Sequence, residues 1–175
     1  GSIVIKENKE YAEKISFIQN AVGAVPSPFD CYLLTRSIKT LSVRMKQHNE
    51  NAIAVSNYLS NHPKIEKVFF PGNDKRHKEI AEKQMDGFGG MMSFVIDSDI
   101  NGVKTFLKNL NLFTLAESLG GVESLIEHPA IMTHASIDPS IREKLGISET
   151  LLRISVGIED VDDLISDLDQ ALSKI

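Results

Sequence analysis

A charged residue inside an apolar run places the strongest limit on how this chain can fold. Residues 151–157 read Leu-Leu-Arg-Ile-Ser-Val-Gly, an aliphatic and β-branched run that is typical of a buried strand. Side chains alternate between the two faces of a strand, so Arg153 shares its face with Leu151 and Ser155. Burying an unpaired guanidinium costs several kcal/mol. The fold must therefore supply an anionic partner for Arg153.

Two kinds of partner would satisfy Arg153. The planar guanidinium fork can hold the carboxylate of a ligand through two parallel hydrogen bonds. An acidic side chain elsewhere in the chain could instead form an internal salt bridge with it. The residues around Arg153 favour neither alternative.

Hydrophobic periodicity and turn residues predict an α/β fold. Strands are expected at 2–5, 65–70, 91–96, 113–115 and 151–156, and helices at 6–20, 31–60, 77–85, 99–110 and 161–173. Asp30 and Asp99 are expected to cap the helices that follow them, and residues 120–139 to form a loop. This order predicts a mostly antiparallel sheet with helices packed on one face.

The helix expected over residues 31–60 is long for a globular protein, which suggests that it connects two domains. We place the boundary so that residues 1–41 end one domain and residues 42–175 form another. A strand expected at 2–5, without a start methionine, indicates a piece of a larger protein. A Gly-Ser extension before a natural start is the alternative.

Composition excludes several classes of function. The 175 residues have a net charge of -5 with acids and bases interspersed, so a nucleic-acid partner is not expected. No apolar run is long enough to span a membrane. The single cysteine, Cys31, is expected to be a buried structural thiol in a cytosolic protein. The five histidines lack metal-ligand spacing, so surface or capping roles are expected for them and no metal site is predicted.

A second candidate segment is 116–121, Ala-Glu-Ser-Leu-Gly-Gly. Here a carboxylate (Glu117) and a hydroxyl (Ser118) precede two glycines, a pattern that suits backbone approaching a ligand closely. A polar strand end closed by a glycine turn is the simpler interpretation.

Five segments, in order along nearly the whole chain, resemble the Cys/Met-metabolism family of pyridoxal-phosphate (PLP) enzymes of fold type I. They are residues 23–31 (GAVPSPFDC), 35–41 (TRSIKTL), 113–125 (FTLAESLGGVESL), 129–136 (PAIMTHAS) and 151–160 (LLRISVGIED).

The resemblance implies a role for each candidate residue. Arg153 matches the arginine that binds the substrate α-carboxylate, and Ser118 matches a serine near the catalytic lysine that helps hold the carboxylate through its backbone. Glu117 matches a position that varies with specificity. A glutamate there is typical of cystathionine γ-synthases and γ-lyases and suits the distal ammonium of cystathionine. Gly121 departs from the acidic residue of methionine γ-lyases.

The resemblance also implies what this chain lacks. The Schiff-base lysine and the groups that hold PLP belong upstream, so no catalytic, cofactor-binding or metal-binding residue is expected here. Residues 1–41 would end the large PLP domain, and residues 42–175 would form the small C-terminal domain. The complete enzyme would be a cytoplasmic homotetramer acting on a small amino-acid substrate, and this chain alone would be inactive.

The expected reaction is γ-replacement or γ-elimination on cystathionine or an O-acyl-homoserine. The alternatives are a stand-alone, non-catalytic structural or interaction domain, a methionine γ-lyase-like enzyme, or a homocysteine-forming member of the family.

Overall fold

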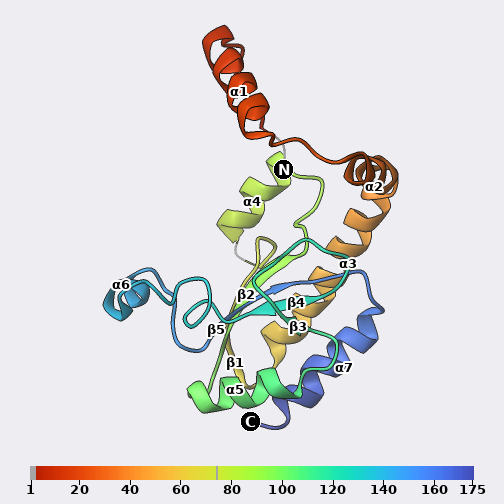
Figure 1. The fold of residues 1–175 in the computed structure, drawn as a ribbon. Helices are drawn as coiled ribbons and strands as arrows, with labels where there is room; N and C mark the ends of the chain where they lie inside the picture. The colour runs from red at the N-terminus through yellow and green to blue at the C-terminus, as the bar shows by residue number, and fades with distance from the viewer. Residues whose placement is uncertain (1–2, 74) are drawn as a thin grey trace. The chain divides into compact units, whose positions relative to one another are not determined.

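The computed structural model of the protein describes residues 3–73 and 75–175. The chain divides into two compact units, Gly1–Leu41 and Ser42–Ile175 (Figure 1). The strand expected at 2–5 is wrong for Ile3–Ile5, which are exposed and have no regular structure, because no neighbouring strand pairs with them. Ser2 lies outside the described residues.

The smaller unit contains two capped helices, α1 (Lys9–Val22) and α2 (Pro28–Ile38). Helix α2 begins with a reciprocal capping box: the Asp30 N–H donates to Ser27 Oγ (3.1 Å), and the Ser27 N–H donates to the Asp30 carboxylate (3.2 Å). Asp30 was expected to be the cap itself. The structure instead places Ser27 at the cap and Asp30 in the first turn.

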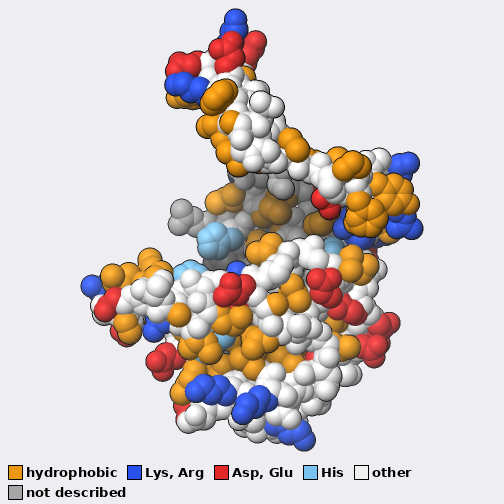
Figure 2. All heavy atoms as spheres, in the orientation of Figure 1, with side chains coloured by type: hydrophobic (Ala, Val, Ile, Leu, Met, Phe, Trp, Pro, Cys, Tyr) orange, Lys and Arg blue, Asp and Glu red, His pale blue; other side chains and the backbone are white. Residues whose placement is uncertain are grey.

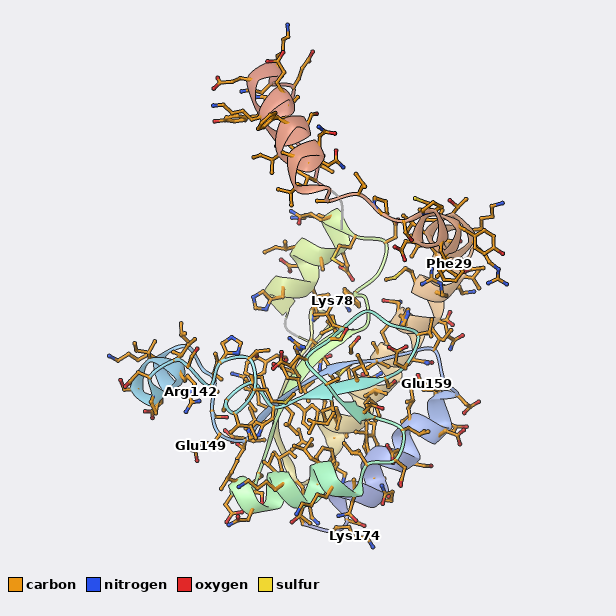
Figure 3. The ribbon with its side chains drawn as sticks, in the orientation of Figure 1. Phe29, Lys78, Arg142, Glu149, Glu159 and Lys174 are labelled. Atoms are coloured by element: carbon orange, nitrogen blue, oxygen red, sulfur yellow. The ribbon has the colours of Figure 1, made fainter. Side chains whose placement is uncertain are left out.

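Neither helix of the smaller unit buries a side chain among the described residues. Figure 2 shows hydrophobic side chains gathered on the surface of this unit. Phe17, Phe29 and Tyr32 are each more than half exposed. Phe29 projects from the start of α2 in Figure 3. Cys31 is also exposed, so the expectation of a buried thiol is wrong. The described part of this unit has no core in which it could be buried.

The single helix expected over residues 31–60 is also wrong. Helix α2 ends at Ile38, and α3 (Leu41–Asn61) begins three residues later. Between them, both the backbone N–H and the hydroxyl of Thr40 donate to the carbonyl of Ser37 (3.2 and 3.1 Å). The apolar stripe continues across this turn, so periodicity alone does not reveal the break.

The larger unit is built around a five-stranded sheet with the order β1-β2-β5-β4-β3 in the described residues. The strands are β1 (Ile65–Phe69), β2 (Met91–Ile96), β3 (Thr114–Leu115), β4 (Leu125–Glu127) and β5 (Leu151–Ser155). Among the strands of the described residues, only the pairing of β3 with β4 is parallel. The remaining helices are α4 (Lys75–Gln84), α5 (Ile100–Asn109), α6 (Pro139–Lys144) and α7 (Val161–Leu172).

One face of the sheet packs against α3, α5 and α7, which confirms the predicted fold class. Leu152 and Ile154 of β5 lie opposite Phe94 and Met92 of β2, so these side chains share a face. They belong to the same buried cluster as residues of the three helices, and the Phe94 ring meets Phe106 of α5 edge-on. The opposite face of β5 carries Leu151, Arg153 and Ser155.

The segment 120–139, expected to be a loop, contributes one strand and the start of a helix. Strand β4 is three residues long, too short for an alternating pattern to reveal it. Helix α6 begins at Pro139, which is preorganised for the first helical position, with Asp138 as its cap. The expected cap at Asp99 is confirmed, since its carboxylate accepts from the N–H groups of Asn101 and Gly102 (2.9 Å each).

Asp167 of α7 fixes the segment that leads into β3. Its carboxylate, only 5% exposed, accepts from the N–H groups of Asn111, Leu112 and Phe113 (2.8, 2.8 and 3.2 Å). Burial by itself would raise the pKa of Asp167, but these backbone donors, together with the Gln170 amide, outweigh it and hold the pKa below its ordinary value.

We expect Asp167→Asn to lower the free energy of unfolding by about 1.5–3 kcal/mol at pH 7, because a charged acceptor of several buried N–H groups is lost. A depressed pKa stabilises the folded state above the ordinary carboxyl pKa of about 4, and this stabilisation is lost as the pH falls through the folded-state value. The difference between the variant and the wild type should therefore shrink below pH 4 in urea titrations. Asp163→Asn, at an exposed position of the same helix, is the control. An equal loss in both variants would contradict the role of Asp167.

Candidate functional site

Arg153 lies on the face of β5 that is turned away from α3, α5 and α7, here called the polar face for Arg153 and Ser155. Strand β5 is the central strand of the five-stranded sheet in the described residues. Arg153 stands beside Ser93 of β2 and Glu127 of β4 in the strand register. Leu152 and Ile154, its neighbours in sequence, are fully buried on the helix-covered face, whereas the Arg153 side chain is 25% exposed. The predicted alternation is therefore confirmed, and it directs the guanidinium away from the core.

The anionic partner of Arg153 within the chain is Glu127. Arg153 Nη2 lies 2.6 Å from Glu127 Oε2, and the Glu127 side chain is 1% exposed. Oε2 has no hydrogen bond of good geometry with the described residues, so the contact is one of charge at short range. Sequence reasoning missed Glu127 because it lies in the segment expected to be a loop. An acid directly after the apolar pair Leu125-Ile126 is the signal that could have revealed it.

Arg153 also binds the backbone of the second candidate segment. Its Nη2 donates to the carbonyl of Glu117 (2.8 Å) and, at 3.5 Å, to that of Ser118. The three residues singled out from the sequence thus lie together, although Glu117 and Ser118 contact Arg153 through backbone oxygens and their side chains are exposed. Among the described residues, every hydrogen bond and ion pair of the Arg153 guanidinium involves Nη2.

A hydrogen bond from Gly120 also holds segment 116–121 along β5. The N–H of Gly120 donates to Ser155 Oγ (2.8 Å), and Ser155 shares the polar face with Arg153. Gly120 adopts a φ of 77°, a left-handed conformation that side chains other than glycine rarely adopt. Segment 116–121 therefore turns directly over β5, in agreement with a glycine turn at a strand end.

Glu159, which lies between β5 and α7 in the sequence and is labelled in Figure 3, binds Ser124, a residue that follows segment 116–121 in the chain. Its carboxylate accepts from the N–H of Ser124 (2.6 Å) and from the Ser124 hydroxyl (3.0 Å). Ser124 Oγ in turn accepts from the N–H of Gly157 (2.8 Å). Asn51 of α3 donates to the carbonyls of Gly157 and Glu159 (3.1 and 2.8 Å). The site therefore rests on a connected polar network that reaches from β5 to α3.

Two histidines for which surface or capping roles were expected are buried. His48 is 4% exposed and its Nδ1 donates to the carbonyl of Val156 (2.7 Å); His128 is fully buried and its Nε2 donates to the carbonyl of Glu149 (2.8 Å). Both rings satisfy backbone carbonyls at strand ends, which the sequence pattern does not reveal. No group of three or more His, Cys, Asp or Glu in the described ranges could hold a metal ion.

Burial lowers the pKa of His128, although the hydrogen bond to the Glu149 carbonyl acts in the opposite direction. Nδ1 of His128 has no partner among the described residues, consistent with a neutral ring that is protonated on Nε2. In Figure 3, Glu149 lies near Arg142 of α6, in the connection that leads back to β5.

The comparisons with known proteins place the chain in a family. The family model described as Cys/Met metabolism PLP-dependent enzyme matches residues 1–173, so the chain belongs to this family, whose cofactor is pyridoxal phosphate. Within the described helices, none is both long and apolar enough to cross a membrane.

Relatives and solved structures show which enzymes of this family the chain resembles. The chain is 53% identical to cystathionine gamma-lyase of Dictyostelium discoideum and 51% identical to cystathionine beta-lyase of Coxiella burnetii, each over 98% of this chain and 45% of the relative. Its fold matches the crystal structure of cystathionine gamma synthase from Xanthomonas oryzae pv. oryzae in complex with aminoacrylate and cysteine. That match has a TM-score of 0.88 and 43% identity, over 97% of this chain and 44% of the other. The chain thus has the fold of the C-terminal region of these enzymes and spans less than half their length.

We expect His128→Gln to lower the acid sensitivity of folding, because glutamine can still donate to the Glu149 carbonyl but does not titrate. A histidine with a lowered folded-state pKa contributes stability above its ordinary pKa of about 6.5 and loses it as the pH falls. The unfolding free energy of the wild type should therefore fall more between pH 7.5 and 5.5 than that of the variant. A parallel pH dependence in His128→Gln and the wild type would show that the buried ring is not responsible.

Proposed function

We propose that this chain is the C-terminal portion of a PLP-dependent enzyme of trans-sulfuration. The reaction is γ-replacement or γ-elimination on cystathionine or an O-acyl-homoserine. The observation that supports this most directly is the position of Arg153, exposed in part and directed away from the core, beside the segment that contains Glu117 and Ser118.

In this proposal Arg153 binds the α-carboxylate of the amino-acid substrate. Its Nη2 is engaged by the chain itself, while Nε and Nη1 have no partner among the described residues and can donate to a ligand. The exposed fraction of the side chain, 25%, gives a ligand access to these donors. A charge-assisted hydrogen bond from a fixed guanidinium then sets the orientation of the substrate.

We assign Glu117 to binding the end of a long substrate that lies away from its α-carboxylate. The Glu117 backbone carbonyl is bound to Arg153, so the distance between the two residues is limited by a direct contact. Its side chain is exposed and can accept from the distal ammonium of cystathionine. Ser118, whose carbonyl lies 3.5 Å from Arg153, helps to fix the same backbone.

Pyridoxal phosphate acts as the electron sink of the family's chemistry. The groups around Arg153 in this chain do not fit its phosphate, because the carbonyls of Glu117 and Ser118 and the carboxylate of Glu127 are all acceptors. The cofactor and the Schiff-base lysine are therefore assigned to the remainder of the enzyme. This chain binds and orients the substrate, and alone it is inactive.

The smaller unit supports the assignment to a larger protein. In residues 1–41, which we assign to the end of the large PLP domain, no described residue of α1 or α2 is buried and many apolar side chains are exposed. Such a surface requires a partner. The proposed partner is the N-terminal part of the same enzyme, with residues 42–175 as the small domain, in a cytoplasmic homotetramer.

A β-lyase is the second candidate, because a relative at 51% identity is a cystathionine beta-lyase. Three assays of the full-length protein separate the reactions. These are cysteine with an activated homoserine ester, cystathionine alone with analysis of the released amino acid, and methionine alone. A stand-alone, non-catalytic domain would be active in none of them.

We expect Arg153→Ala in the full-length, PLP-loaded enzyme to raise the KM for the amino-acid substrate strongly. Loss of a charged partner of a bound carboxylate costs about 2–5 kcal/mol, which corresponds to roughly 30-fold to several-thousand-fold in kcat/KM. Arg153→Lys keeps the charge but not the fork, and its effect should be intermediate. Steady-state kinetics unchanged from the wild type would refute the role of Arg153.

Glu117→Gln and Glu117→Ala should impair the enzyme toward cystathionine more than toward a short thiol amino acid such as cysteine, because only cystathionine has the distal ammonium. The loss of one charge-assisted hydrogen bond should cost about 1.5–3 kcal/mol in kcat/KM for cystathionine. Ser118→Ala is the matched control, since Ser118 contributes its backbone and not its hydroxyl. Equal losses for the two substrates would show that Glu117 does not set specificity.

A further inference from the structure

Arg153, Glu117 and Ser118 form the proposed substrate-carboxylate clamp, in which the buried carboxylate of Glu127 has no role of its own. Glu127 is 1% exposed and lies on β4 directly opposite Arg153 in the strand register. A carboxylate in this position costs free energy to desolvate, and a pair of apolar residues could replace a buried ion pair at little cost or with a gain in stability. Stability alone therefore does not explain why Glu127 is there.

Both oxygens of Glu127 are engaged. Oε2 lies 2.6 Å from Arg153 Nη2, and Oε1 accepts a hydrogen bond from the hydroxyl of Thr133. Thr133 Oγ1 also lies 2.8 Å from His134 Nδ1. The single hydroxyl proton of Thr133 is directed to Glu127, so His134 is assigned as the donor in the second contact. A directional chain thus runs from His134 through Thr133 to Glu127.

The same contacts divide the Arg153 guanidinium into two edges. Nη2 meets Glu127, Glu117 and Ser118, which all belong to the chain. Nε and Nη1 form no hydrogen bond or ion pair with the described residues. A guanidinium anchored at one nitrogen in this way presents its remaining N–H groups in a fixed direction, whereas an unanchored arginine samples several rotamers.

We propose that Glu127 is a positioning residue for the substrate-carboxylate clamp and that Thr133 orients Glu127. This inference rests on the proposed function. Glu127 fixes Arg153 through Nη2, so that Nε and Nη1 meet the carboxylate of the amino-acid substrate at a defined angle. Its negative charge also balances Arg153 before the substrate arrives.

The consequence for catalysis differs from that of removing Arg153. With Glu127→Gln, the positive charge of Arg153 remains and still attracts a carboxylate, and the repulsion between two carboxylates that share one guanidinium disappears. The ion pair that holds Nη2 is lost, however, so only the carbonyls of Glu117 and Ser118 still orient the guanidinium. Misplacement of a bound substrate by about 1 Å can cost on the order of 100-fold in rate. Glu127→Gln should therefore lower kcat more than it changes KM.

The test uses the full-length, PLP-loaded enzyme. We expect Glu127→Gln to lower kcat by about 10- to 100-fold and to change KM by less than about threefold. Thr133→Val should show the same pattern with a smaller loss, and Thr133→Ser, which keeps the hydroxyl, should restore the wild-type kcat. Glu66→Gln, an exposed change on the edge strand β1, is the control.

A crystal structure of ligand-free Glu127→Gln provides a readout that is independent of activity. The Arg153 guanidinium should leave its wild-type position or occupy several rotamers. A wild-type kcat in Glu127→Gln, or an Arg153 that stays in place, would overturn the proposal. If Glu127→Gln does not fold, the Thr133→Val and Thr133→Ser pair decides the matter by the same two readouts.

Failure of this inference can be told apart from failure of the proposed function. If Arg153→Ala raises KM while Glu127→Gln leaves kcat unchanged, only the positioning role fails. If Arg153→Ala leaves the kinetics unchanged but Arg153 moves in the Glu127→Gln structure, Glu127 positions Arg153 and the clamp itself is wrong.

Discussion

The ion pair between Arg153 and Glu127 is the interaction on which the polar face of the sheet depends. The two residues face each other across β5 and β4, and Nη2 to Oε2 is 2.6 Å. Without Glu127, the Arg153 charge would meet only neutral groups of the chain, and without Arg153 a fully buried carboxylate would be left uncompensated. Because the pair is satisfied, a charged residue can stand in the middle of an otherwise apolar strand.

The strand alternation of β5 connects this pair to the rest of the fold. Leu152 and Ile154 join the core formed with α3, α5 and α7. A slip of the strand by one residue would therefore remove them from this core and turn the polar side chains of Arg153 and Ser155 toward it. Ser155 and Arg153 both bind the segment 116–121. Core packing on one face therefore determines where the polar contacts form on the other.

The two units of the chain differ in what holds them together. Residues 42–175 contain a continuous core, whereas the helices of residues 1–41 rely on caps and local hydrogen bonds and bury no described side chain. This difference explains why Cys31 and the apolar residues around it are exposed. The exposed apolar residues of these helices are the reason for proposing that the helices pack against another part of the enzyme.

Long, periodic elements could be predicted from the sequence, because their hydrophobic residues recur with the period of the structure. Strand β2 occupies the predicted residues 91–96, and α5 and α7 deviate from prediction by only one or two residues. The three-residue strand β4 could not be found this way, since its position is decided by pairing with β3 and β5. The break between α2 and α3 was hidden by an uninterrupted apolar stripe.

For the site, the sequence alone determined that Arg153 needs an anion and which face of its strand it occupies. It also marked Glu117 and Ser118 as candidates. Only the tertiary structure decided that Glu127 is the internal partner and that both candidates meet Arg153 through backbone carbonyls. The physical reason is the separation in sequence of the residues that decide each feature. Alternation within a strand is a local property, whereas the choice of partner depends on strand pairing between residues far apart in the chain.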